Sequence, residues 1–278
     1  MVFNSLVTGT RFKSRLDALK EVVAVARQGW LIPQAGRSIQ HHAESDHLVV
    51  FVHGYFASAG VFNPMARHLA HTRMAPRQVH FTYLPQGSIA HHAERLARVV
   101  ERARPTGPVS LVAHSLGGLI SRYYAQVLGG RMDALVAMGT PHRGTRRAEG
   151  WPLGLARELT PGSPTLRTLE ATRSKLSHAR LTSVVGLQDL LVTPESAALA
   201  GSRVVHVDGV GHHGLLYHPE AWDVTIEEIT HAARKAEHRH HPRERHDSGV
   251  RAVHTASGAN EEEARRHAHP MKLRARGG

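Results

Sequence analysis

The sequence predicts an α/β protein with a mostly parallel, doubly wound sheet of about six strands. Short β-branched runs begin at residue 47 and alternate with longer stretches whose apolar residues recur at helical spacing. Strands that alternate with helices form βαβ units, which place helices on both faces of a parallel sheet. The chain of 278 residues is long enough to bury a substantial core.

The elements of this fold can be assigned in order along the chain. The expected strands are residues 48–52, 79–83, 109–112, 134–138, 181–185 and 203–207. The expected helices are residues 61–71, 89–104, 116–128 and 220–231. The gap at about residues 140–178 is longer than an ordinary connection and rich in Pro, Gly and Thr, so we expect a helical cap or lid there.

Two further segments flank this body, which spans residues 46–231. Residues 1–45 are expected to be a helical lead-in, since apolar residues between positions 16 and 26 fall at helical spacing. That helix would either pack on the body, the simpler expectation, or lie on a membrane surface. Residues 232–278 hold 11 Lys+Arg, 6 Asp+Glu and 7 His but no aromatic residue, which predicts a disordered basic, His-rich tail with transient helix at 261–266.

The amino-acid composition limits which kinds of catalytic chemistry and which binding partners this protein could have. The absence of Cys excludes a disulfide framework, a Cys-ligated metal and a thiol nucleophile. The net charge of +12 divides into +5 on the tail and +7 on residues 1–231, and it does not by itself predict a specific nucleic-acid partner. No secretory signal is readable in the first 30 residues and no apolar run approaches the roughly 20 residues of a membrane span, so we expect a cytoplasmic protein.

The most informative motif follows the third predicted strand. The apolar run 109–113 leads directly into His114-Ser115-Leu116-Gly117-Gly118, and a helix follows. This is the nucleophile-elbow pattern small-x-Ser-x-Gly, in which a sharp turn raises the serine hydroxyl above the sheet edge. Strand and helix nearly touch at such a turn, which explains the small residues on either side of the serine. The alternative is a Gly-rich turn with a spectator serine.

A nucleophilic serine needs a general base and an acid that orients the base. With this elbow they follow in the order Ser, Asp or Glu, His. Asp189 follows the fifth predicted strand, and His212 stands in a Gly-flanked loop after the sixth, so both would lie at the same sheet edge as Ser115. The alternatives are Asp208 as the acid and His213 as the base, or Asp189 as a helix cap or turn residue.

Two backbone N–H groups should stabilise the oxyanion that forms when the serine attacks an ester, each worth about 3 kcal/mol. The expected donors are Leu116, directly after the nucleophile, and Tyr55, after the His-Gly pair that ends the first strand. Further candidates for the substrate pocket or lid are His53, Gly54, His114, His142, Trp151 and Leu155. No metal site and no cofactor is expected.

Residues 47–231 resemble the α/β-hydrolase superfamily, specifically bacterial lipases with an Ala-His-Ser-x-Gly-Gly elbow. The resemblance is carried by His53-Gly54, Ala113-His-Ser-Leu-Gly-Gly118, Gly139-Thr-Pro-His-Arg-Gly144, Asp189 and Gly209-Val-Gly-His-His-Gly-Leu-Leu216. It implies an α/β-hydrolase fold and a serine hydrolase that cleaves lipid or other acyl esters. The catalytic residues would be Ser115, Asp189 and His212. An acyltransferase or thioesterase on the same fold, or a non-catalytic binding module with a basic tail, are the alternatives, and contact with a lipid surface is compatible with each.

Overall fold

A six-stranded parallel sheet carries the side chains that matter for function. The strands are β1 (Leu48–Val52), β2 (Arg77–Phe81), β3 (Val109–His114), β4 (Ala134–Met138), β5 (Arg180–Gly186) and β6 (Arg203–Val207). Their order in the sheet is β2-β1-β3-β4-β5-β6, and every neighbouring pair is parallel. The computed structural model describes residues 15–31, 45–103, 105–149 and 154–240. It confirms the predicted α/β class and the six strands.

Helices cover both faces of this sheet because the central strands are apolar on both sides. In β1, Leu48, Val50 and Val52 pack with one layer, and Val49 and Phe51 pack with the other. Alternate side chains of a strand point to opposite faces, so a strand buried on both sides is a continuous apolar run. This is why β1 could be read from the sequence with its correct bounds.

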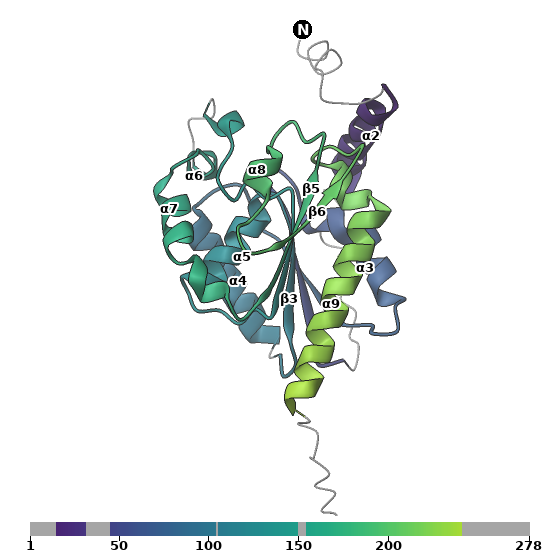
Figure 1. Cartoon of the computed structure of the whole chain (residues 1–278), viewed down its shortest axis with the longest axis vertical. Helices are drawn as coiled ribbons and strands as arrows, with labels where there is room; N and C mark the ends of the chain where they lie inside the picture. The colour runs from purple at the N-terminus through teal and green to yellow at the C-terminus, as the bar shows by residue number, and fades with distance from the viewer. Residues whose placement is uncertain (1–14, 32–44, 104, 150–153, 241–278) are drawn as a thin grey trace, which may run out of the picture. The chain divides into compact units, whose positions relative to one another are not determined.

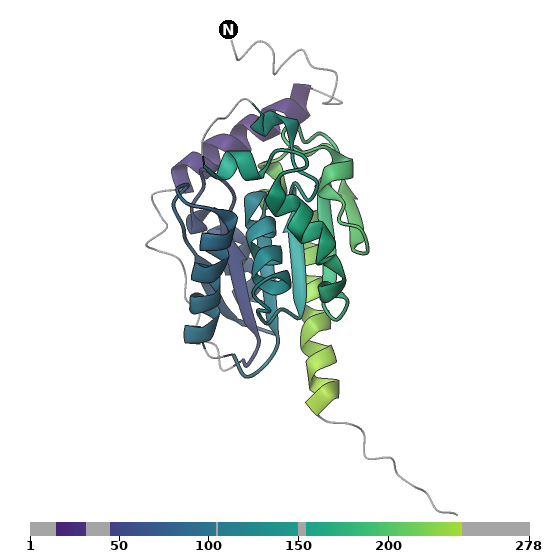
Figure 2. The same cartoon turned by 90° about the vertical axis from the view of Figure 1, so that its left-hand side faces the viewer.

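The two helical layers are visible on either side of the sheet when it is viewed along its edge (Figure 1). Helices α4 (Ile89–Ala103) and α5 (Leu116–Gln126) cover one face, which is turned toward the viewer in Figure 2. Helices η2 (Ala59–Phe62), α3 (Asn63–Ala70) and α9 (Pro219–His240) cover the other face.

The C-terminal helix is longer than the sequence pattern predicts. The prediction ended it at His231 and began a disordered tail at Ala232, but α9 continues to His240 and Ala232 is buried. The start of the tail at residue 232 was therefore wrong. The residues after position 231 include Ala, Arg, Lys and Glu, which are strong helix formers even where few apolar side chains are present. Residues 241–278, including the segment 261–266, lie outside the described part of the chain.

The N-terminal helix α2 (Arg15–Leu31) packs on the body through a narrow inner face. Ala24 and Leu31 are buried, and the helix lies next to η2 and to η5 (Gly214–Tyr217), the short helix after β6. The opposite side of α2 leaves several apolar side chains exposed, among them Leu19, Val22, Val23 and Trp30. Among the described residues, no helix combines the length and the apolar character that crossing a bilayer requires.

The long connection between β4 and β5 folds onto the α5 side of the sheet. It contains η3 (Arg146–Ala148), α6 (Leu155–Glu158), α7 (Pro164–Ala171) and η4 (Arg173–Leu176), while residues 150–153 lie outside the described chain. Leu155 and Leu169 are fully buried in the core cluster that contains α5. Gln126 Nε2 and Arg122 Nη2 of α5 both donate to the Leu169 carbonyl, at 2.6 and 2.9 Å. Helix α7 of the connection is thus anchored to helix α5.

Candidate active site

Ser115 occupies a strained turn between β3 and α5. Its backbone dihedrals are φ 54° and ψ −126°, and its N–H donates to the Met138 carbonyl of β4 at 2.8 Å. A non-glycine residue at positive φ is uncommon and costs of order 1–3 kcal/mol. Because it persists only where the surrounding structure enforces it, such strain is found mainly at functional sites. Because α5 begins directly at Leu116, the turn leaves Ser115 at the C-terminal edge of the sheet.

Gly117 allows the helix to begin this close to the neighbouring strand. A Cβ atom at this position would lie 2.2 Å from the Val52 carbonyl oxygen and 2.6 Å from that of His53. Both contacts are with backbone that the sheet holds in place, so no side chain fits. The requirement for a small residue two positions after the serine, inferred from the elbow pattern, therefore has a direct steric cause.

Asp189 and His212 form a buried hydrogen-bonded pair at the same edge. Asp189 Oδ2 lies 2.7 Å from His212 Nδ1, and both side chains are almost fully buried. The other oxygen, Asp189 Oδ1, accepts hydrogen bonds from the N–H groups of Leu191 and Val192, each at 2.8 Å. These two donors fix the carboxylate, which in turn orients the imidazole and keeps a proton on Nδ1.

The pKa of His212 is raised above its ordinary value. Burial alone lowers it, but the charge of Asp189 and the hydrogen bond to Asp189 outweigh burial, and Glu21 adds a further raising contribution. A raised pKa matches a base that has to take a proton and return it.

Ser115 and His212 line one cavity of about 260 Å³. Its apolar lining consists of Phe56, Pro141, Ala148, Ala156, Leu159, Leu191 and Val192. Thr145 and Arg147 add polar groups to the wall. Within the described chain no hydrogen bond joins Ser115 Oγ to His212. Such bonds are often long before substrate binds.

The two expected oxyanion donors flank Ser115. Leu116 is the first residue of α5, where a backbone N–H has no acceptor within the helix, and Tyr55 lines the cavity from the loop after β1. His53 holds that loop: its Nδ1–H donates to the Gly54 carbonyl at 2.8 Å, and its Nε2 accepts from the Tyr83 N–H at 3.2 Å. Burial lowers the pKa of His53 to about 4, so the ring is neutral.

His53 and Gly54 are not part of the lining of the cavity. They were expected among the pocket or lid residues, but the cavity around Ser115 is lined by Tyr55 and Phe56 from this loop instead. His53 also stacks on the Tyr83 ring at 4.2 Å. A strand-ending His-Gly pair can be recognised in a sequence, whereas the direction of its side chain depends on Tyr83, which is 30 residues away.

His114 lines the cavity and also supports the histidine loop. Its Nε2–H donates to the His212 carbonyl oxygen at 3.0 Å, which fixes the backbone of that residue. The His114 side chain is buried, and burial together with the neighbouring His212 and His213 lowers its pKa well below the usual range. The ring therefore acts as a neutral hydrogen-bond donor.

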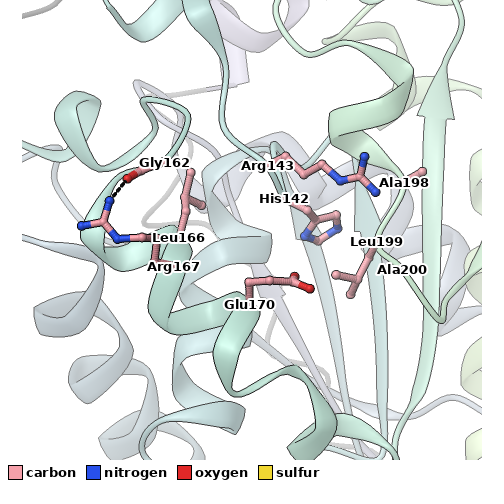
Figure 3. Close-up of a pocket in the computed structure, with 9 residues that line it drawn as sticks. All are labelled: His142, Arg143, Gly162, Leu166, Arg167, Glu170, Ala198, Leu199 and Ala200. Carbon is pink, nitrogen blue, oxygen red and sulfur yellow. Dashed lines mark hydrogen bonds between the residues drawn. The ribbon is translucent and has the colours of Figure 1, made fainter.

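Two other expected pocket residues, His142 and Leu155, are not part of the lining of this cavity. His142 lines a second cavity of about 280 Å³, where its ring lies between Arg143 and Glu170 (Figure 3). Its Nδ1 is 3.4 Å from Arg122 Nη1, and burial with the charge of Arg122 lowers its pKa well below normal. Leu155 is buried in the core, and Trp151 lies outside the described residues.

Glu21 of α2 contacts the loop that carries His212, although nothing in the sequence singled it out. Its Oε1 accepts from the His213 N–H at 2.8 Å and from His213 Nδ1 at 3.1 Å, and its Oε2 accepts from the Gly214 N–H at 3.0 Å. A lone Glu in an amphipathic helix usually belongs to the solvated face, so no local pattern reveals this contact. The competing acid, Asp208, accepts from Gln188 Nε2 at 3.0 Å.

Comparisons with known proteins agree with this fold. A family model described as the alpha/beta hydrolase fold matches residues 47–157. The mature Bacillus licheniformis lipase BlEst2 is 15% identical with a TM-score of 0.59, over 69% of this chain and 95% of that one. A carboxylesterase of the thaumarchaeon Nitrososphaera gargenis is 14% identical with a TM-score of 0.51, over 71% and 94% of the two chains.

A monoacylglycerol lipase from Paleococcus ferrophilus is also similar, at 16% identity and a TM-score of 0.50, over 66% of this chain and 94% of that one. These likenesses establish a shared fold. The chain therefore has the α/β-hydrolase fold.

Proposed function

We propose that this protein is a serine hydrolase of carboxylic esters that works through an acyl-enzyme intermediate. The observation that carries the proposal is the Asp189–His212 pair, 2.7 Å apart, on the same cavity as a serine held at φ 54°. Nucleophile, base and orienting acid come from the ends of three strands of one parallel sheet. No other serine among the described residues has a positive φ.

The reaction proceeds in two halves. Ser115 Oγ attacks the ester carbonyl carbon while His212 Nε2 takes the hydroxyl proton, and Asp189 stabilises the imidazolium through Nδ1. The N–H groups of Leu116 and Tyr55 hold the oxyanion. The C–O bond then breaks, and the leaving alcohol receives the proton from His212. A water molecule then attacks the acyl carbon while His212 takes its proton. The bond between that carbon and Ser115 Oγ breaks, the acid leaves, and His212 returns the proton to Ser115 Oγ.

The cavity lining supports an acyl chain as the part of the substrate that is recognised. Apolar side chains predominate, and Ala156 and Leu159 come from the connection between β4 and β5. We propose that this connection, residues 140–178, is the acyl-binding wall and lid. The exposed apolar side of α2 supports a lipid surface as the source of the ester.

A profile of hydrolysis rates tests this proposal. p-Nitrophenyl esters with acyl chains of 2–16 carbons are compared with acyl-CoA thioesters, and with the same esters in the presence of alcohol acceptors. We expect hydrolysis of oxygen esters to be fastest, and a Ser115→Ala variant to be inactive. Faster thioester cleavage, or transfer to alcohol in preference to water, would instead assign a thioesterase or an acyltransferase.

The alternative of a non-catalytic binding module with a basic tail makes a different prediction. Binding of nucleic acid through Lys and Arg falls steeply with salt concentration. The alternative would be supported by two results together. The protein would be inactive on every ester, and it would bind DNA with a steep salt dependence, with this binding lost when the chain is truncated after His240. We expect ester hydrolysis by the truncated protein to equal that of the full chain.

A further inference from the structure

The carboxylate of Glu21 occupies the centre of the turn that carries His212. It accepts three hydrogen bonds, two from backbone N–H groups of that turn and one from the His213 ring. Its side chain is 17% exposed, and it comes from a helix 192 residues earlier in the chain. The turn is therefore fastened to α2 as well as to the sheet.

The glycines of the turn fit this carboxylate. A Cβ atom at Gly211 would lie 2.6 Å from Glu21 Cδ, and one at Gly214 would lie 3.1 Å from Glu21 Oε2. Neither glycine has a positive φ, so backbone conformation does not require them. The Glu21 carboxylate occupies the space that a Cβ atom at either position would enter. The glycines on either side of the two histidines thus leave room for a side chain of the N-terminal helix.

Glu21 carries a negative charge at neutral pH. Burial raises its pKa, but the hydrogen bonds and charge of His213, with the Gly214 N–H, outweigh burial and lower it overall. The groups that face His212 are Asp189 of the β5–α8 loop, His114 of β3, its neighbour His213, and Glu21 of α2. Here α8 denotes Pro194–Ala197. Glu21 is therefore a second anion acting on the imidazole, after Asp189.

We infer that Glu21 is a positioning residue for His212, and that α2 is in this way part of the active site. The inference rests on the proposed ester hydrolysis. Glu21 touches neither substrate nor the reacting atoms: it fixes the backbone at positions 213 and 214, and so fixes where the preceding imidazole stands relative to Ser115.

The main test replaces Glu21 by Gln in the full-length protein, with Glu94→Gln as the matched control. Glu94 is an exposed residue of α4, on the sheet face opposite α3 and α9. Gln keeps the volume of Glu21, but its NH₂ group has to face one of the three donors. We expect kcat for a p-nitrophenyl ester to fall roughly tenfold with KM within about twofold, because small misplacements of catalytic groups are costly.

The pH profile separates positioning from simple structural support. The negative charge of Glu21 raises the pKa of His212, so its removal lowers that pKa. The acid limb of the kcat profile should therefore move to lower pH in Glu21→Gln and stay in place in Glu94→Gln. A lower Tm with an unmoved acid limb would show that Glu21 only stabilises the fold, and would overturn the inference. An unchanged kcat would overturn it as well.

A double-mutant cycle tests the contact itself. Gly211→Ala should lower kcat in the wild-type background, because the new methyl group meets the Glu21 carboxylate. In the Glu21→Ala background the same substitution should cost several-fold less, since the space has been vacated. Effects that simply multiply would show that the two positions do not interact, which contradicts the inference.

Labelling with a fluorophosphonate distinguishes failure of this inference from failure of the proposed function. A wild-type protein that is not labelled at Ser115 overturns the proposed function, and the role of Glu21 falls with it. A wild-type protein that is labelled, with Glu21→Gln labelled at the same rate, overturns the role of Glu21 alone. The inference predicts labelling of both proteins, with the variant slower by roughly the factor seen in kcat.

Discussion

Replacing Asp189 with Asn would reverse one hydrogen bond while leaving the shape of the site intact. Asp189 Oδ1 accepts from two backbone N–H groups, so the amide oxygen of Asn has to take that place. The NH₂ group then faces His212 Nδ1, 2.7 Å away in the wild type, where two donors would meet. His212 can relieve the conflict only by moving its proton to Nε2, where it can no longer accept the Ser115 proton.

The expected loss follows from that change of tautomer. An Asp-to-Asn replacement in a Ser-His-Asp arrangement lowers kcat by on the order of 10⁴-fold, because the geometry remains and the wrong nitrogen is protonated. The assay is kcat for the p-nitrophenyl ester that the wild type hydrolyses fastest. A thermal melt alongside it should show a folded variant, since both backbone N–H groups keep their acceptor.

Asp208→Asn is the matched control for this prediction. Asp208 is the acid that competed with Asp189 for this role in the sequence, and its carboxylate accepts from the side chain of Gln188. We expect the control to retain kcat within a few-fold. An Asp189→Asn variant that keeps a tenth or more of the wild-type kcat would refute the assigned role, and so would a control that loses as much activity as Asp189→Asn.

Three further predictions concern the pKa of His212, the turn after β3 and the exposed side of α2. In a pH titration, kcat/KM should rise with pH through a midpoint above 6.5, the ordinary pKa of a histidine. The reason is that His212 has to be neutral to act as a base and its pKa is raised. A midpoint below 6.5 would contradict the assignment of His212 as the base. Gly117→Ala should cost about 3 kcal/mol of folding free energy, because its Cβ would lie 2.2 Å from the Val52 carbonyl. A thermal melt should show this as a Tm roughly 6–12 °C lower, whereas Gly29→Ala, with no atom within 4 Å of the new methyl, should keep its Tm. Trp30, which is 71% exposed on α2, should contribute to adsorption on a lipid surface. Trp30→Ser should therefore weaken co-sedimentation with phosphatidylglycerol vesicles without changing kcat for a water-soluble ester. Equal co-sedimentation of the variant and the wild type would argue against a role of this surface in adsorption.

The sheet was predictable wherever burial on both faces produces a continuous apolar run. The bounds of β1 and β4 match the apolar runs 48–52 and 134–138. The second strand was placed two residues too late, at 79–83 rather than Arg77–Phe81. Thr82 and Tyr83 have strand-forming side chains, whereas the register begins with Arg77 opposite Leu48, a backbone pairing that hydropathy does not reveal.

The residues that meet at the candidate site were predictable because topology brings them together. In a parallel sheet the C-terminal ends of neighbouring strands share one edge, so side chains that follow β3, β5 and β6 approach one another. The lining of the cavity was less accessible to this reasoning. Leu155 belongs to an apolar helical stretch, but only the packed structure shows that it faces the core while Leu159 lines the cavity.

The contact between Glu21 and the histidine loop was beyond the reach of the sequence for a physical reason. Apolar periodicity identified α2 as a helix and predicted that it packs, but it gave no partner for Glu21. The glycines at 211 and 214 were read as loop-formers, although their lack of a side chain also leaves room for a carboxylate far away in sequence. A pairing of this kind depends on the docking angle of a helix, which no local pattern encodes.

The proposed mechanism depends on Ser115 as the nucleophile that becomes acylated. The most direct measurement is mass spectrometry of the intact protein and its peptides, after brief mixing with an excess of p-nitrophenyl ester at low pH and rapid quenching. We predict a mass increase of one acyl group on the peptide that contains Ser115, and none on the Ser115→Ala variant. An acyl group found on another residue, or an equal mass increase in Ser115→Ala, would contradict the account.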